Sequence, residues 1–195
     1  MRFSLMAAAT ALLTISNTAE LSAQAVVPHD CEQDDSHVMA LRACTTLLET
    51  GKLDDATRVR YLVRRGYAWL ADEDGADGAK EDFTRALQNE PANVKALKGR
   101  AKAHTLLGEN NLAAADWSAI LASRPEAGQM EAALMARGAA LQADGQLDAA
   151  LADYAKALEL NPKSEAAHIA RAGVFAARDD RASALKEYEL ARAIK

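Results

Sequence analysis

The sequence has little of what interrupts regular secondary structure. Its 195 residues include only 4 prolines and 10 glycines, and aromatic residues make up 5% of the chain. Half of the residues (50%) are nevertheless apolar, which is enough for one domain with a hydrophobic core and argues against disorder. Because alanine and leucine are abundant while glycine is scarce, the segments favour helices that approach one another closely.

The chain also lacks an excess of positive charge and any motif that performs chemistry. Its formal net charge of −5 argues against binding nucleic acid or an anionic membrane over the whole surface. Neither a phosphate-binding loop, a metalloprotease helix, a nucleophile elbow nor a Cys/His nucleophile arrangement occurs. We therefore expect no enzymatic activity, no cofactor, and no catalytic or metal-binding residue.

The apolar run at the N-terminus is too short to cross a bilayer, which takes about 20 apolar residues. This run, FSLMAAATALLTI at residues 3–15, follows Arg2 and precedes Ala23-Gln24-Ala25, the order typical of a secretory signal peptide. A buried N-terminal helix is the alternative. We expect residues 1–25 to be removed after Ala25, a mature chain in the periplasm or secreted space, and no membrane span.

Only two cysteines are present, Cys31 and Cys44. In an oxidising compartment such a pair predicts a disulfide, with two free thiols as the alternative. On one continuous helix the two residues would lie roughly 20 Å apart, beyond the ~7 Å limit between bonded α-carbons. Residues 31–35 must therefore fold back along a helix that begins near Ser36, for which Asp34, Asp35 and Ser36 are candidate N-caps.

The rest of the sequence is repetitive, and its prolines mark the period. Pro91, Pro125 and Pro162 each follow an alanine by twelve residues, and that alanine is followed by an aromatic residue and then by a further apolar one. Spacings of four and seven place these three positions on one helical stripe. The four copies are Ala79-Phe83-Ala86, Ala113-Trp117-Ile120, Ala150-Tyr154-Ala157 and Ala184-Tyr188-Ala191.

The segment before each copy repeats as well, with a shared i, i+4, i+7 pattern. Its four versions are Leu62-Gly66-Trp69, Leu97-Ala101-His104, Leu134-Gly138-Leu141 and His168-Ala172-Phe175. Turn-like sequences (DEDGADG, LGENN, ADGQ and RDDR) separate the two halves. Each unit is thus a helix, a tight turn and a second helix, which the proline ends because it cannot continue a helix.

These motifs resemble those of the tetratricopeptide repeat family, with L-G-x2-Y-like first helices, A-x3-F-x2-A second helices and a period of about 34 residues. The resemblance covers residues 59–195 as repeats 59–91, 92–125, 126–162 and 163–195, and we place three extra residues of the third in the link EAGQM. It implies an all-α, right-handed superhelical solenoid of four helix-turn-helix repeats. An N-terminal segment, 26–58, carries the cysteines and one extra helix at 36–50.

An arginine and an acid occur in register in all four units. The arginines are Arg65, Arg100, Arg137 and Arg171, and the acids are Asp82, Asp116, Asp153 and Glu187. A structural ladder of arginine–carboxylate pairs is the simpler interpretation, since each arginine has a matching acid. A row that binds anions is the alternative.

In this family the inner face of the first helices lines a concave groove that binds partner segments. At the equivalent positions here the first two units carry Arg60, Arg64, Tyr67, Lys95, Lys98 and Lys102, and the later ones carry Met135, Ile169 and small residues. The family's two-carboxylate clamp is not intact, because Val63 and Tyr67 replace its first Lys and Asn. We expect a groove that is basic at its N-terminal end and apolar at its C-terminal end, or a merely solvated lysine-rich face.

The resemblance implies a non-enzymatic adaptor that binds a protein or peptide, with an acidic segment or a C-terminal carboxylate fitting the basic end. An assembly protein that self-associates, or docks on an envelope complex, is the alternative. It would use the C-terminal edge around Leu185, Tyr188 and Ile194, which no further helix of this sequence covers. Neither hypothesis requires a cofactor or nucleic acid.

Overall fold

The described part of the chain is a row of antiparallel helices joined by short turns. The computed structural model describes Cys31 and residues 36–194, so the expected signal peptide (1–25) and the candidate caps Asp34 and Asp35 lie outside the described residues. The helices are α2 (His37–Thr50), α3 (Asp55–Trp69), α4 (Ala76–Asn89), α5 (Val94–Leu106), α6 (Asn110–Ala122), α7 (Ala127–Ala143), α8 (Leu147–Leu160), α9 (Glu165–Ala177) and α10 (Arg181–Ala193).

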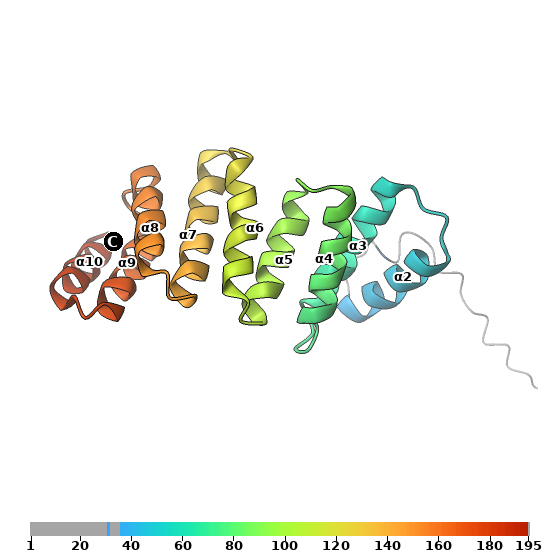
Figure 1. Ribbon diagram of the computed structural model, residues 1–195, viewed down its shortest axis with the longest axis horizontal. Helices are drawn as coiled ribbons and strands as arrows, with labels where there is room; N and C mark the ends of the chain where they lie inside the picture. Colours follow the sequence, from blue (N-terminus) through green and yellow to red (C-terminus); the bar gives the residue numbers. More distant parts are fainter. Residues whose placement is uncertain (1–30, 32–35, 195) are drawn as a thin grey trace, which may run out of the picture.

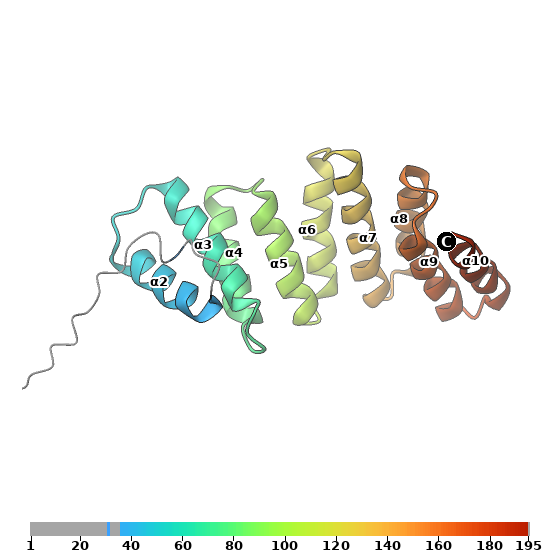
Figure 2. The same ribbon diagram turned by 180° about the vertical axis from the view of Figure 1, so that it is seen from behind.

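Each helix packs against the helix before it and the helix after it, and the row extends along one axis from α2 to α10 (Figures 1 and 2). The pairs α3/α4, α5/α6, α7/α8 and α9/α10 are the four expected units, and α2 is the extra helix. Because one amphipathic helix cannot bury its apolar stripe alone, stacking buries a continuous core. The all-α solenoid predicted from the sequence is confirmed.

Polar side chains at four helix starts accept hydrogen bonds from backbone N–H groups that have no partner inside the helix. Ser36 accepts from the Met39 amide at the start of α2, which makes it the cap among the three candidates. The same type of bond starts α3, α5 and α10, from the side chains of Asp54, Asn93 and Asp180. Each cap of this kind stabilises its helix by about 1 kcal/mol.

In three of the four units, the turn between the two helices contains one residue with a positive φ. Gly108 (φ 73°) and Gly145 (φ 79°) occupy this position in the second and third units, where a side chain would be strained. Asp179 (φ 60°) occupies it in the fourth, and Asp tolerates this conformation better than most residues. The same turn is thus built by different residues at one register position.

Two boundaries differ from those we expected. The first unit begins at Asp55 rather than at residue 59, because Asp54 caps α3. The EAGQM segment is not a link: α7 begins at Ala127 and is 17 residues long, against 13 for α5 and for α9. The extra residues of the third unit therefore lengthen its first helix by about one turn.

Glycines allow close contact between helices and aromatic rings. A β-carbon added at Gly66 would lie 2.8 Å from the Phe83 ring, and one at Gly138 would lie 2.6 Å from the Tyr154 ring. Gly99 of α5 also contacts Phe83, where an added β-carbon would lie 2.2 Å away. The small residues expected at the helix crossings are therefore needed, and Phe83 is enclosed from both sides.

Candidate functional site

The arginines and acids of the four units form pairs inside the solenoid. Arg65 donates from Nε and Nη2 to the two carboxylate oxygens of Asp82, both at 2.7 Å. Arg100–Asp116 (2.9 and 2.6 Å) and Arg137–Asp153 (2.7 and 2.6 Å) repeat this bidentate geometry. These hydrogen bonds raise the pKa of Arg65 and of Arg137, although burial opposes the shift.

Two of the arginines also reach the preceding helix. Arg65 Nη1 donates to Thr45 of α2, and Arg137 Nη1 donates to Ser118 of α6, both at 3.1 Å. The acids are almost fully buried, with exposed fractions of 2–4% for Asp82, Asp116 and Asp153. In these three pairs Nε and Nη2 of each arginine are both bonded to the buried carboxylate, a geometry that links the two helices of the unit.

The fourth pair has a different geometry. Arg171 Nη2 donates to Glu187 Oε1 at 2.7 Å, while the other oxygen of Glu187 lies 2.7 Å from His168 Nδ1. Arg171 Nε has no partner. Burial would raise the pKa of Glu187, but hydrogen bonds from Arg171 and His168 outweigh it and lower that pKa.

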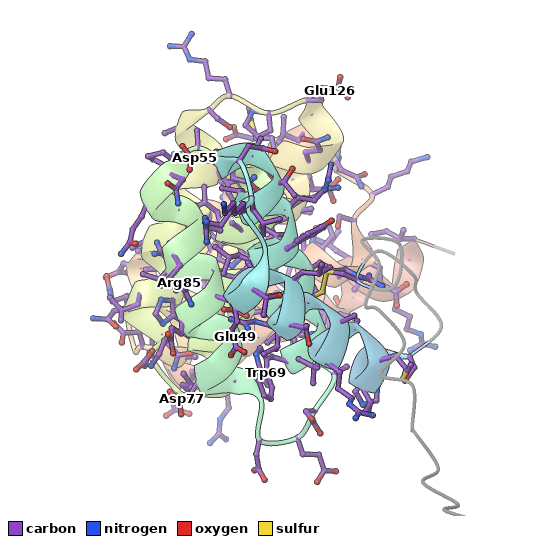
Figure 3. All side chains as sticks on the ribbon, turned by 90° about the vertical axis from the view of Figure 1, so that its right-hand side faces the viewer. Glu49, Asp55, Trp69, Asp77, Arg85 and Glu126 are labelled. Atoms are coloured by element: carbon purple, nitrogen blue, oxygen red, sulfur yellow. A yellow bond between two sulfur atoms is a disulfide. The ribbon has the colours of Figure 1, made fainter. Side chains whose placement is uncertain are left out.

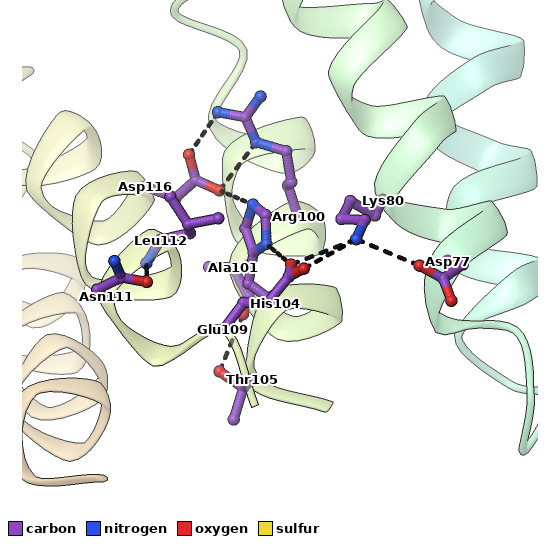
Figure 4. Close-up of polar contacts among 10 residues, drawn as sticks. All are labelled: Asp77, Lys80, Arg100, Ala101, His104, Thr105, Glu109, Asn111, Leu112 and Asp116. Carbon is purple, nitrogen blue, oxygen red and sulfur yellow. Dashed lines mark hydrogen bonds and ion pairs between the residues drawn. The ribbon is translucent and has the colours of Figure 1, made fainter. Parts of the chain in front are cut away.

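A second histidine, His104, contacts two acids of its own unit, and one of these acids also binds a lysine of the unit before it. His104 Nδ1 lies 2.6 Å from Glu109 Oε2, and its Nε2 lies 3.8 Å from the Asp116 carboxylate (Figure 4). Lys80 of α4 donates to Glu109 at 3.1 Å. The hydrogen bond from His104, followed by that from Lys80, lowers the pKa of Glu109. His104 and His168 are both buried, as expected at positions that are apolar in the other repeats, but each is hydrogen-bonded to an acid.

The N-terminal disulfide is present. Cys31 and Cys44 are joined with their α-carbons 4.8 Å apart, and both side chains are fully buried. The bond ties Cys31 to α2, at the end of the solenoid that faces the viewer in Figure 3. Arg64 Nε donates to the Cys31 carbonyl at 3.3 Å, so the bond fixes Cys31 over α3. Cys44 occupies the register position that an aromatic residue takes in the repeats.

The basic residues of the expected groove line two neighbouring cavities along α3 and α5. The first, which we call the basic cavity, has a volume of about 580 Å³. It is lined by Arg60, Arg64, Tyr67 and Lys95, with Val59, Val63 and Glu90 among the rest. Arg64 contacts Cys31 as well, so its charge lies between the disulfide segment and the cavity.

The second cavity, which we call the tryptophan cavity, also has a volume of about 580 Å³ and lies between α5 and α7. Lys98, Lys102 and Leu106 line it from α5, Ala136, Ala139 and Ala143 from α7, and Trp117 from α6. Tyr67 lines both cavities, and its hydroxyl donates to the Lys95 carbonyl at 2.9 Å. The edge-to-face contact of Tyr67 with Phe83, at 5.1 Å, fixes the ring between the two cavities.

The two apolar residues of the expected groove do not line these cavities. Met135 is half-buried and packs against core clusters around Leu134 and Tyr154. From α7, the residues that line the tryptophan cavity are instead Ala136, Ala139, Ala140 and Ala143. Ile169 is 44% exposed on α9 and lines neither cavity.

Trp117 lines the groove although its position in the repeat did not predict it. Its position in the packing stripe predicted a buried ring, like those of Phe83 and Tyr154, which are 0% and 1% exposed. In the structure the Trp117 ring packs against the core on one side and lines the cavity on the other. A tryptophan where the other units carry smaller rings was the available signal.

The C-terminal edge is apolar and open. Leu185 and Tyr188 of α10 are 60% and 46% exposed, and Leu190 is 40% exposed. Elsewhere in the described residues, no group of three or more His, Cys, Asp or Glu side chains is arranged to hold a metal ion. None of the described helices combines the length and the apolar character needed to cross a membrane.

Paired helices stacked in one direction, with an inner face of first helices and small residues at the crossings, define a tetratricopeptide-type solenoid. Residues 131–164 match the family model of the tetratricopeptide repeat. The third unit is therefore a tetratricopeptide repeat, and the chain has the fold of proteins built from such repeats, which confirms the resemblance. Solenoids of this kind are interaction scaffolds rather than typical enzymes.

Solved structures of MamA share this fold. MamA from Desulfovibrio magneticus RS-1, residue 41 to the end, has a TM-score of 0.71 and 21% identity over 86% of this chain and 90% of its own. The MamA RS-1 ArsTM double mutant has a TM-score of 0.71 and 22% identity over 86% of this chain and 89% of its own. MamA MSR-1 has a TM-score of 0.67 and 19% identity over 81% of this chain and 86% of its own. No curated protein matches the chain by sequence.

Proposed function

We propose that this chain is an exported, non-enzymatic adaptor that binds a protein segment in the groove formed by the basic cavity and the tryptophan cavity. The observation that carries the proposal is a local reversal of charge. The chain has a net charge of −5, yet Arg60, Lys95, Lys98 and Lys102 line the two adjoining cavities, with Glu90 as the one acid among the lining residues. Such a surface attracts acidic segments and repels basic ones.

Export rests on two observations. The residues before Val26 have the order of a signal peptide, and Cys31 and Cys44 form a disulfide, which persists in oxidising compartments. The partner is thus a protein or peptide of the periplasm or the secreted space, with acidic side chains or a terminal carboxylate at the basic end.

Reversing charge inside the groove tests the proposal. We expect Lys98→Glu with Lys102→Glu to remove the proteins that the wild-type chain captures from envelope extract, because the attraction becomes repulsion. The matched control is Lys163→Glu with Lys186→Glu, which changes the net charge equally on exposed residues outside the two cavities. Capture by the wild type should weaken with added salt, since the groove charges are solvent-accessible.

The exposed apolar edge of α10 favours a second candidate, self-association or docking through Leu185 and Tyr188. The same experiment separates the two functions when a third variant, Leu185→Ser with Tyr188→Ser, is added. Capture that survives the groove reversal but is lost in the edge variant would contradict the groove and favour the edge.

A further inference from the structure

The tryptophan cavity exists because two first helices are held apart. Within the described residues, α5 and α7 contact each other less than α3 contacts α5 or α7 contacts α9. The cavity lies in this opening, with α5 on one side, α7 on the other and Trp117 of α6 between them. This inference rests on the proposed function and concerns what the opening binds.

The register of the repeats shows how the opening exposes the ring. One position on each first helix faces the aromatic ring of the preceding unit, and Gly99, Ala136 and Ala170 occupy it in successive repeats. Gly99 contacts Phe83, and Ala170 packs in the core cluster of Tyr154. Ala136 lines the cavity together with Trp117, so part of that ring faces the opening.

The rim of the cavity is positive and its walls are apolar. Lys98 and Lys102 lie four residues apart on α5, one turn of the helix, and no carboxylate is among the described residues that line the cavity. Leu106, Trp117 and four alanines of α7 provide the apolar surface. The volume of about 580 Å³ falls in the range of ligand-binding sites, about 300–1,000 Å³.

We propose that this cavity binds one large apolar side chain of an acidic peptide segment, whose neighbouring carboxylates pair with Lys98 and Lys102. A leucine or phenylalanine of the partner fills the space between α5 and α7 and covers Trp117. Apolar burial supplies most of the affinity, because buried anchors dominate binding energy while rim charges set orientation and association rate. The chemistry recognised is a bulky apolar residue with acids on both sides.

Synthetic peptides test this directly on the oxidised chain. Each carries four glutamates around one central residue, which is phenylalanine, leucine or alanine, and a matched set replaces glutamate by glutamine. We expect the phenylalanine and leucine peptides to bind at least about tenfold more tightly than the alanine peptide. The glutamine set should bind at least about tenfold more weakly and lose its salt dependence.

The two tryptophans provide an internal control for the site. The indole N–H resonance of Trp117 should shift on titration, whereas that of Trp69, which packs beside Gly78 away from the cavity, should not. Ala139→Leu fills the cavity and should weaken the phenylalanine peptide at least about tenfold. Ala115→Leu makes the same change on α6, at the separate cavity lined by Lys80 and Arg100, and should leave affinity unchanged.

Equal binding of the three central residues, no saturable binding of any peptide, or an unmoved Trp117 resonance would overturn the inference. The proposed function can fail separately. If Ala139→Leu keeps the partners captured from envelope extract while the lysine reversal loses them, the groove binds without an apolar anchor. If neither variant loses them, both proposals are wrong.

Discussion

At the scale of single residues, the arginine–acid ladder shows that the same position of each repeat can hold either an aspartate or a glutamate. Three units pair an arginine with an aspartate through two parallel hydrogen bonds, and the fourth pairs Arg171 with Glu187. The longer glutamate lets His168 take its second oxygen, so Arg171 makes only one bond to it. The pairs link the two helices of each unit, and that explains their repetition better than anion binding does.

We expect Arg137→Ala to lower the free energy of unfolding by about 3 kcal/mol, because Asp153 is left charged and buried without its partner. Affinity for groove ligands should not change, since Arg137 lines neither groove cavity. Denaturant unfolding and peptide titration measure the two effects.

The matched control is Arg178→Ala. Arg178 pairs with Asp148 at 2.7 Å, but the side chains are 42% and 87% exposed, so the loss should stay below about 1 kcal/mol. Lost binding with unchanged stability in Arg137→Ala would instead favour the anion-binding interpretation of the ladder.

At the scale of helices, close packing depends on which residue faces each aromatic ring. Gly66 and Gly99 enclose Phe83, and Gly138 contacts Tyr154, so these crossings leave no room for a methyl group. The crossing over Trp117 remains open and forms the cavity. The same repeat pattern thus produces closed and open junctions, and the open one carries the proposed site.

Gly138→Ala tests this dependence in α7. Alanine favours a helix, but its β-carbon would lie 2.6 Å from Tyr154, so we expect a loss of about 1–3 kcal/mol from overpacking. Gly128→Ala in the first turn of the same helix meets no atom within 4 Å and should leave the melting temperature unchanged or slightly raised. Equal melting temperatures in the two variants would contradict the packing argument.

At the scale of the whole molecule, the solenoid is a chain of neighbour contacts with unequal ends. The α2 end is fixed by the Cys31–Cys44 disulfide, whereas among the described helices α10 packs mainly on α9 and exposes Leu185 and Tyr188. Because each unit contacts only its neighbours, one end can open while the rest stays folded. The contact of Glu187 with Arg171 and His168 is therefore important for the C-terminal end.

Acid should open that end first. The pKa of Glu187 is lowered in the folded chain, so its contribution to stability is complete above the ordinary glutamate pKa of about 4.3 and is lost as pH falls through the lower, folded value. We expect the amides of α10 to lose exchange protection before those of α3–α6 as pH falls towards about 3.

Glu187→Gln is the control for this effect. It should weaken protection of α10 at neutral pH and make that protection less dependent on pH, because the titrating group is gone. Simultaneous loss of protection along the whole chain in the wild type would show that the solenoid unfolds as one unit.

The sequence by itself determined the helices, the repeat and the pairing of the cysteines. Ala113, Trp117 and Ile120 recur at helical spacing, Pro125 and its equivalents end the second helices, and two cysteines allow one pairing. These features are local, since periodicity and turn chemistry act within one unit. The glycines at positions 66 and 138 likewise predicted that the two helices of a repeat approach each other closely.

Only the tertiary structure decided which way the groove opens. Whether Met135 faces the core, and whether Trp117 is covered, depends on the distance between α5 and α7. That distance follows from how whole units stack, including the lengthened α7, and no spacing within one repeat encodes it. The sequence shows the lysines, but their position at the edge of an apolar opening results from the packing between repeats.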